Sequence, residues 1–273
     1  MLRFFTTIKK DEITSLAIGG FDGMHLGHMA LVKELDDKGV LLVIDKGFSN
    51  LTPDEYRCRF VKNGCVVLNL EMIKSFGVDE FIEFLNLSFP SLKKIVVGYD
   101  FRFGRDRVGK AESFKKYFDV KTVDEVVVNG ISVHSNIIRD FIKSAKFEEA
   151  NKLLGRSYKV VGEHIKGQGI GAKELVATIN LKTNFLLPKD GVYATKTFIA
   201  GKEYKSVSFI GKRETTDGKE AFETHLLDTK INLLEKTVEV EFVKFIRANK
   251  KFDTIKALKQ QIKEDISKVK ESF

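Results

Sequence analysis

The sequence lacks several features that would place it in a specialised class of protein. Its 273 residues include no tryptophan, 3 prolines and 2 cysteines. No apolar run approaches the ~18 residues of a membrane-spanning helix. The N-terminal stretch MLRFFTTIKKDEI has neither the apolar segment nor the small-residue cleavage site of a secretory signal. We therefore expect a cytoplasmic protein.

The two cysteines also argue against a stapled or metal-bound scaffold. Cys58 and Cys65 are seven residues apart, with no histidine and no second cysteine pair nearby. Zinc sites and disulfide frameworks need more ligands or more cysteines than this. We expect both side chains to be reduced thiols that are buried or partly buried.

Composition and charge favour a folded protein with anionic partners. Hydrophobic residues make up 43% of the chain and charged residues 31%, with a formal net charge of +8. A basic balance attracts phosphorylated small molecules, nucleic acids or membrane surfaces. The densest basic runs, KRETTDGKE and RANKKFD, are interrupted by acidic or polar residues. We expect no nucleic-acid stripe and no membrane partner.

The first half alternates apolar runs with helical patterns, which predicts a doubly wound α/β fold with a parallel sheet. The expected strands are 16–19, 40–45, 65–70 and 94–100, with a last strand and turn at 120–130; the expected helices are 26–37, 53–61, 78–85 and 110–117. Two short helices over 135–155 end at Gly155, a suitable C-cap.

After about residue 157 the pattern changes to β-branched segments separated by turns. This predicts a small antiparallel barrel or sandwich, with a hairpin turn at AGKE (200–203). The chain closes with an amphipathic helix capped by Asp253 or Thr254. Its apolar stripe consists of Ile255, Leu258, Ile262, Ile266 and Val269. We therefore predict two domains, residues 1–156 and 157–273.

The segment GGFDGMHLGH, residues 19–28, is the strongest candidate for a binding site, and we call it the histidine loop. Between the first strand and the first helix it would offer free backbone N–H groups to an anion. His25 and His28 are three residues apart and would share one side of the first helical turn. A metal half-site or two structural histidines are the alternatives, and the spacing of a P-loop is absent.

The histidine loop resembles the H-x-G-H loop of nucleotidyltransferases, specifically the G-N-F-D-G-V-H-L-G-H of prokaryotic bifunctional riboflavin kinase/FMN adenylyltransferases. VVGYDFRFGRDRVG (96–109) and VHSNIIRDFIKSAKFEEANKLLGRSY (133–158) resemble further segments of that family. In the β-rich half the resemblance continues through GQGIGAKELVATINL, LPKDGVYA, VSFIGKRETTDG, FETHLLD and IRANKKFDTIKALKQQIKED. It implies a Rossmann-like nucleotidyltransferase domain followed by a riboflavin kinase-like barrel that a helix closes.

For the N-terminal domain, the resemblance implies that ATP adenylylates FMN with catalytic roles for His25, His28 and Arg139. It implies that Asp100 helps to place FMN and that Ser135, with Arg139, contacts the pyrophosphate side. The residues implied to bind nucleotide or flavin here are Gly19, Phe21, Gly23, Gly27, Asp100, Phe101, Arg102 and Ser135. Without the motif, Arg139 would be an ordinary solvated helix charge, and Asp100 and Arg102 a loop ion pair.

For the C-terminal domain, the resemblance implies that Glu223 is the catalytic base that accepts the riboflavin hydroxyl proton. Thr178 and Asn180 match the Thr and Asn of the P-T-A-N motif, which serve Mg²⁺ and phosphate. The other residues implied to bind the cofactor are Gly167, Gly171 and Arg247, with Gly169 in the same glycine-rich loop. From alternation alone, Glu223 faces away from Phe222, Thr224 and Leu226, toward a cavity or toward water.

The sequence departs from the family at several positions. Gly20 replaces an Asn, and HSN (134–136) replaces S-S-T. In the kinase half, Ala177 takes the Pro position of P-T-A-N and Ile179 the small Ala position, while Phe209 and Glu214 replace the Asn and Pro of N-I-G-x-x-P-T. Thr178, Asn180 and Glu223 are retained.

The leading hypothesis is a bifunctional enzyme that makes FMN from riboflavin and FAD from FMN, with ATP and Mg²⁺. The alternatives are a monofunctional FMN adenylyltransferase with a degenerate kinase domain, a non-catalytic flavin- or nucleotide-binding regulator, and a nucleic-acid-binding protein suggested by the net charge of +8.

Overall fold

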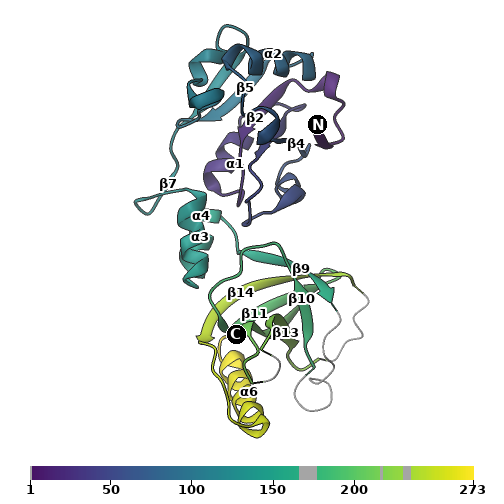
Figure 1. Ribbon diagram of the computed structural model, residues 1–273, viewed down its shortest axis with the longest axis vertical. Coiled ribbons are helices and arrows are strands. Elements are labelled where there is room, and N and C mark those ends of the chain that lie inside the picture. The colour runs from purple at the N-terminus through teal and green to yellow at the C-terminus, as the bar shows by residue number, and fades with distance from the viewer. Residues whose placement is uncertain (1, 166–176, 216–217, 230–234) are drawn as a thin grey trace. The chain divides into compact units, whose positions relative to one another are not determined.

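The computed structural model describes residues 2–165, 177–215, 218–229 and 235–273. The chain divides into two compact units (Figure 1). The first unit comprises Met1–Ile137 and Leu153–Gly155, and the second comprises Ile138–Lys152 and Arg156–Phe273. Most of the helical segment over 135–155 therefore groups with the second unit. No helix among the described residues is both long and apolar enough to cross a membrane.

The first unit is built on a six-stranded sheet with the order β1-β4-β3-β2-β5-β6. The strands are β1 (Arg3–Phe5), β2 (Ser15–Gly19), β3 (Val40–Asp45), β4 (Cys65–Asn69), β5 (Lys94–Gly98) and β6 (Asp119–Val123). Strands β2 to β6 pair in parallel, which confirms the doubly wound prediction, and β1 joins the edge antiparallel to β4. Sequence patterning missed β1 because all three of its side chains are exposed.

The connections in the first unit are shorter and more varied than predicted. They contain α1 (Leu26–Val32), α2 (Val78–Ser88), the hairpin β7 (Val127–Val128) and β8 (Ile131–Ser132), and the 3-10 helices η1 (Lys10–Glu12), η2 (Asp54–Phe60), η3 (Leu70–Met72), η4 (Arg105–Arg107) and η5 (Ala111–Phe114). The helix predicted over 26–37 ends at Val32. The backbone N–H of Asp36 donates instead to Ser15 Oγ (3.1 Å), and Gly39 closes a turn onto Asp36.

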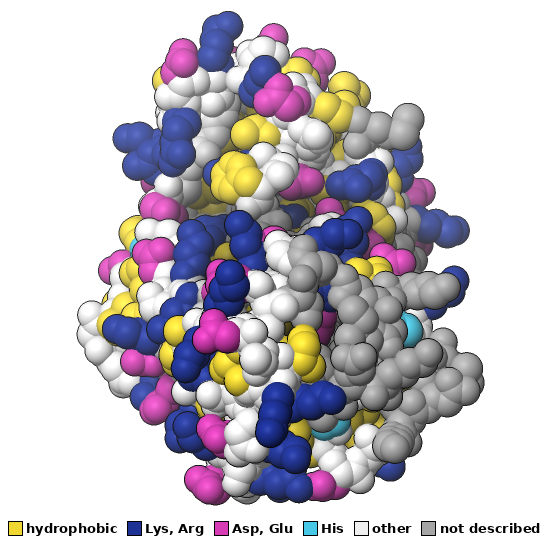
Figure 2. Space-filling model, turned by 60° about the horizontal axis from the view of Figure 1, so that its bottom comes forward, with side chains coloured by type: hydrophobic (Ala, Val, Ile, Leu, Met, Phe, Trp, Pro, Cys, Tyr) yellow, Lys and Arg dark blue, Asp and Glu magenta, His cyan; other side chains and the backbone are white. Residues whose placement is uncertain are grey.

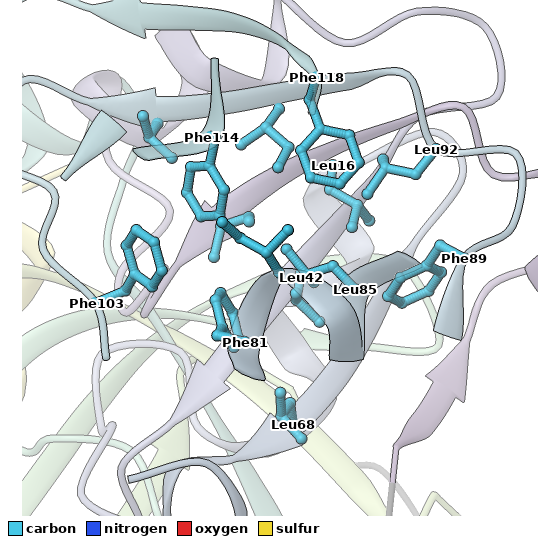
Figure 3. Packing of buried hydrophobic residues seen from close by; sticks show 14 of the residues in the cluster. Leu16, Leu42, Leu68, Phe81, Leu85, Phe89, Leu92, Phe103, Phe114 and Phe118 are labelled. Atoms are coloured by element: carbon cyan, nitrogen blue, oxygen red, sulfur yellow. The ribbon is translucent and has the colours of Figure 1, made fainter. Parts of the chain in front are cut away.

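Apolar side chains cover both faces of this sheet. The cluster on one face includes Leu16, Leu42, Leu68, Phe81, Leu85, Phe89, Leu92, Phe103, Phe114 and Phe118 (Figure 3). The rings of Phe103 and Phe114 stack 4.4 Å apart. Ala17, Leu41 and Val43 belong to the opposite cluster. Burial on both faces explains why these strands read as continuous apolar runs rather than as alternating patterns.

The second unit is dominated by a closed antiparallel barrel with the order β10-β13-β12-β11-β14-β9. The strands are β9 (Lys159–Ile165), β10 (Ile179–Lys182), β11 (Gly191–Ile199), β12 (Lys202–Lys212), β13 (Glu220–Leu226) and β14 (Thr237–Arg247), which confirms the predicted barrel. The hairpin between β11 and β12 turns at Ala200 (φ 48°) and Gly201 (φ 78°). Such left-handed values at both central residues suit a two-residue hairpin.

The barrel encloses a ring of five hydroxyl groups. Contacts run from Thr195 to Ser206 (2.8 Å), Ser206 to Thr197 (2.7 Å), Thr197 to Thr224 (3.1 Å), Thr224 to Ser208 (3.0 Å) and Ser208 back to Thr195 (2.8 Å). All five side chains belong to residues with 0% exposure. Because a hydroxyl both donates and accepts, the ring satisfies these polar groups without water.

In the described part of the second unit, helices lie on both sides of the barrel strands in sequence. α3 (Ser135–Lys143) and α4 (Phe147–Leu154) precede it, and α6 (Ile255–Lys270) follows it against β11, β12 and β14 (Figure 1). α4 ends at Gly155, which adopts the left-handed conformation (φ 70°) expected of a C-cap. Thr254 caps α6 by accepting a hydrogen bond from the backbone N–H of Ala257 (3.1 Å), as predicted.

The expectation of two reduced thiols is wrong. Cys58 and Cys65 form a disulfide, with their Cα atoms 5.0 Å apart. The chain turns back between them: Gly64 adopts a left-handed φ of 79°, and its N–H donates to the carbonyl of Val61 (3.0 Å). This turn brings the start of β4 beside η2, a proximity that the count and spacing of cysteines do not reveal.

Candidate functional site

The histidine loop, which joins β2 to α1, is held by two buried apolar side chains. Phe21 and Met24 are 1% and 0% exposed and belong to the same apolar cluster as Ala17, Leu41 and Val43. Both residues have positive φ, 53° and 40°. Left-handed backbone is costly at residues other than glycine and persists where the surroundings enforce it. These two side chains therefore anchor the loop in the apolar core and define its backbone conformation.

The two histidines lie on the same side of the first turn of α1. Their rings stack with centroids 3.6 Å apart, and the ring of His28 meets Phe21 edge-on at 5.1 Å. His25 caps the helix, because its Nδ1 accepts a hydrogen bond from the backbone N–H of His28 (3.3 Å). Among the described residues, no group of three or more His, Cys, Asp or Glu side chains is arranged to hold a metal ion.

Asp22 ties the histidine loop to the segment after β3. Its carboxylate accepts hydrogen bonds from the backbone N–H groups of Asn50 (3.2 Å), Leu51 (3.0 Å) and Thr52 (2.9 Å). The Thr52 hydroxyl accepts in turn from the N–H of Gly23 (2.7 Å). Sequence reasoning gave Asp22 no role, although its place among glycines in GFDG was a signal that this carboxylate has a specific task.

Ser135 contacts the same loop. Its hydroxyl donates to the backbone carbonyl of Asp22 (2.7 Å), across 113 residues of sequence. Arg139 lies one turn further along α3 and is half-buried, but the division between the units falls between Ile137 and Ile138. The two residues therefore belong to different units, and a role for Arg139 beside the histidines stays a prediction.

Arg57 is the most buried charged side chain near the histidine loop, at 1% exposure. Its Nη1 donates to the carbonyl of Gly20 (2.6 Å) and to Ser49 Oγ (3.2 Å), and its Nε donates to the carbonyl of Asp54 (3.0 Å). Burial lowers the pKa of Arg57, although Asp45, Asp22 and Asp54 act in the opposite direction. Sequence analysis did not find this residue, because its contact with the histidine loop, at Gly20, spans 37 residues.

The predicted flavin segment follows β5, which pairs in parallel with β2. The carboxyl ends of both strands therefore meet at one edge of the sheet, where ligands bind in such folds. Asp100 and Arg102 are exposed there, and Phe101 packs against Phe103 (5.7 Å) and Phe114 (6.1 Å). Arg102 donates to the carbonyl of Phe101 (2.8 Å).

A cluster of polar side chains that was not predicted lies beside Asp100. The Tyr99 hydroxyl is 3.2 Å from Glu125 Oε1 and 3.3 Å from His134 Nε2, and the Ser132 hydroxyl donates to the same carboxylate. The hydrogen bond from Ser132, with a further contribution from Tyr99, lowers the pKa of Glu125. Desolvation, followed by the bond to Glu125, raises the pKa of Tyr99.

In the second unit, Glu223 is paired with an arginine. Arg213 Nη1 lies 2.8 Å from Glu223 Oε1, and the two side chains are 19% and 18% exposed. Phe222, Thr224 and Leu226 are buried while Glu223 is not, which confirms the predicted alternation along β13. The two alternatives for Glu223 were a cavity and open water. The carboxylate instead faces the guanidinium of Arg213 and is partly exposed.

A cavity of about 470 Å³ lies beside this pair. Its polar lining includes Asn180, Lys182, Thr183, Arg213, Lys219 and Glu220. Asn180 is also the register partner of Glu223 across β10 and β13. Thr178 is half-buried just before β10. Three cationic side chains against the one carboxylate of Glu220 give the lining an excess of positive charge, which suits an anionic ligand. Gly167, Gly169 and Gly171 lie outside the described residues.

Arg247 connects the barrel to its terminal helix. Its guanidinium forms two parallel hydrogen bonds with Asp265 of α6, from Nε (2.9 Å) and from Nη2 (2.7 Å). The Asp265 carboxylate is buried, with a side chain only 4% exposed. The predicted cofactor-binding role of Arg247 stays a prediction beside this structural contact.

The comparisons with known proteins decide the family. A family model described as Flavokinase: Riboflavin kinase matches residues 154–273. A bifunctional riboflavin kinase/FMN adenylyltransferase from Buchnera aphidicola subsp. Acyrthosiphon pisum is 31% identical over 307 residues, which cover 100% of this chain and 98% of the relative. The chain belongs to the bifunctional riboflavin kinase/FMN adenylyltransferase family. The enzyme of that name from Pseudomonas fluorescens is 29% identical over 92% of this chain and 90% of its own length.

A solved structure extends the similarity to the fold of this riboflavin kinase/FMN adenylyltransferase family member. It is titled a macrolide-efflux protein from Streptococcus pneumoniae, and it matches with a TM-score of 0.77 and 26% identity over 96% of this chain and 97% of its own. The agreement covers both the parallel-sheet unit and the barrel unit.

Within this family member, the described residues form two groups. In the first unit, the histidine loop and Ser135 come together, and the segment over 100–102 follows a neighbouring strand at the same sheet edge. In the second, Asn180 and Glu223 lie opposite each other, with Arg213 added by the structure. Figure 2 shows Lys and Arg side chains interspersed with Asp and Glu among the described residues of the face in view.

Proposed function

We propose that this chain uses ATP twice, to phosphorylate riboflavin to FMN in the second unit and to adenylylate FMN to FAD in the first. The observation that carries the proposal is similarity along the whole chain: a bifunctional riboflavin kinase/FMN adenylyltransferase is 31% identical over 100% of it. The riboflavin kinase family model, which matches residues 154–273, supports the assignment of the kinase to the barrel.

In the kinase reaction, the 5′-hydroxyl oxygen of riboflavin forms a bond to the γ-phosphorus of ATP while the bond to the bridging oxygen breaks and ADP leaves. Glu223 accepts the hydroxyl proton, a task that a carboxylate next to the reacting oxygen can perform. Arg213, 2.8 Å from that carboxylate, fixes its orientation and adds positive charge beside the cavity. Asn180 contributes an amide to the same wall.

In the adenylyl transfer, a phosphate oxygen of FMN forms a bond to the α-phosphorus of ATP and pyrophosphate leaves. His25 and His28 donate hydrogen bonds to the phosphate oxygens, and the rigid histidine loop holds both rings in place. No proton has to be taken from a hydroxyl in this reaction, because the nucleophile is already an anion. Positioning and stabilisation of charge therefore supply most of the rate enhancement.

Mg²⁺ fits the donors that the kinase half offers. Thr178 and Asn180 present a hydroxyl and an amide oxygen, both half-buried, and Mg²⁺ prefers oxygen ligands. Such an ion is commonly held by one or two protein groups together with the substrate phosphates. When bound, it would neutralise phosphate charge, while Thr178 and Asn180 orient the phosphates toward Glu223.

A product assay tests the proposal. The purified chain is incubated with ATP and Mg²⁺ and with either riboflavin or FMN, and the flavins are separated by chromatography. We expect FAD from both substrates, and Glu223→Gln should stop only the reaction of riboflavin. FAD from FMN alone would favour a monofunctional adenylyltransferase whose VATIN segment (176–180) has lost kinase function. No product from either substrate would contradict the proposal and favour a flavin-binding regulator.

A further inference from the structure

Arg57 joins the histidine loop to the neighbouring β3–η2 segment. One guanidinium nitrogen bridges the carbonyl of Gly20 (2.6 Å) and Ser49 Oγ (3.2 Å), while Nε reaches the carbonyl of Asp54 (3.0 Å). A third nitrogen lies 3.8 Å from Asp45 at the end of β3. A planar fork of donors can serve several acceptors in fixed directions at once.

The connection is reciprocal, because Asp22 of the histidine loop accepts three backbone N–H groups from Asn50 to Thr52. A cation from one segment and a carboxylate from the other thus lock two loops at the same end of adjacent parallel strands, β2 and β3. The contact made by Arg57 falls on Gly20, a position at which a Cβ would meet no atom within 4 Å. Gly20 has no side chain of its own to pack, and the hydrogen bond from Arg57 fixes its carbonyl beside the buried Phe21.

We propose that Arg57 is a positioning residue for adenylyl transfer: it sets the backbone of the histidine loop so that His25 and His28 meet the nucleotide phosphates in the reactive geometry. This inference rests on the proposed adenylyltransferase function of the first unit. Arg57 does not itself touch substrate, since its side chain is 1% exposed. It acts through the carbonyl of Gly20, five residues before His25.

The test uses the full chain, because the second activity reports on folding. Arg57→Met keeps much of the apolar stem and removes every donor. We expect its kcat for FAD formation from FMN to fall about 100-fold, with KM for FMN changed less than about threefold, because loose positioning costs rate rather than ground-state binding. Riboflavin phosphorylation should stay at the wild-type rate. Arg59→Met is the matched control, since Arg59 is exposed and lies over the Tyr56 ring (4.2 Å).

Arg57→Lys guards against a folding defect. It keeps the charge but offers a single nitrogen, which cannot serve Gly20, Ser49 and Asp54 together. The inference is supported if Arg57→Lys has the melting temperature and the kinase rate of the wild type. Its kcat for FAD formation should then lie between those of Arg57→Met and the wild type. An unchanged kcat in Arg57→Met overturns it, as does a loss of both activities in Arg57→Lys. If the wild type makes no FAD from FMN, the proposed function itself fails, before any variant is compared.

Discussion

Arg213 and Glu223 form an ion pair across two adjacent strands of the barrel, with Nη1 and Oε1 2.8 Å apart. Arg213 follows β12, Glu223 lies in β13, and the register of the two strands pairs Phe209 with Glu223. Arg213 lines the cavity of about 470 Å³ together with Asn180, which is the register partner of Glu223. The chain therefore brings the predicted base and a cation that was not predicted to the same wall of the second unit.

Removal of this cation should weaken the kinase alone. We expect Arg213→Met to lower kcat/KM for riboflavin phosphorylation about 100-fold, because the carboxylate of Glu223 loses the cation that orients it and the cavity loses one positive charge. FAD formation from FMN should not change. The measurement is the initial rate of each reaction in the same preparation. Lys212→Met alters the exposed neighbouring side chain and should be neutral; equal rates in the two variants would rule out the expected role.

The hydroxyl ring inside the barrel should contribute measurably to stability. Thr224→Val keeps the shape of the side chain but leaves Thr197 and Ser208 each without one partner in the ring. We expect the free energy of unfolding to fall by about 1–3 kcal/mol, the usual cost of an unsatisfied buried hydroxyl. Urea denaturation measures it. Thr237→Val, on an exposed residue, is the control, and a similar midpoint in both variants would contradict the prediction.

Asp265 should determine whether α6 stays docked on the barrel. Asp265→Ala removes a buried carboxylate that accepts two hydrogen bonds from Arg247. Because the partly exposed guanidinium loses its partner, we expect the free energy of unfolding to fall by about 2 kcal/mol and amide hydrogen exchange in α6 to become faster. Hydrogen exchange resolved by mass spectrometry reports both changes. Lys263→Ala, at an exposed position of the same helix, should leave exchange unchanged. If the amides of α6 in Asp265→Ala exchange as slowly as in the wild type, the ion pair is dispensable.

The pKa of Glu125 should depend on Ser132. The hydrogen bond from Ser132 lowers this pKa, so the bond favours the ionised, folded form above the unfolded pKa and loses this effect as the pH falls through the folded pKa. We expect Ser132→Ala to raise the pKa of Glu125 toward its ordinary value, as carboxyl carbon NMR can measure. Glu148, whose pKa is lowered by Lys152, is an internal reference. A Glu125 pKa that does not move would show that the bond is absent in solution.

The sequence predicted those parts of the fold that depend on local pattern. Apolar runs marked the central strands β2 to β5, and β-branched segments separated by turns marked the barrel, since strand and turn preferences act within a few residues. Thr254 as helix cap and the turn at Ala200–Gly201 follow from hydrogen bonds and backbone preferences within a few residues. The helices expected over 53–61 and 110–117 became 3-10 helices instead.

The candidate sites divide in the same way. The sequence by itself determined which segments carry the chemistry, because glycines, paired histidines and the carboxylate of Glu223 are recognisable where they stand. Only the tertiary structure decided that Arg57 holds Gly20 and that Arg213 meets Glu223. The first contact spans 37 residues and the second 10 across a strand pair. In both cases the long cationic side chain could reach many groups, and the pairing of the strands in the folded unit selects its partner.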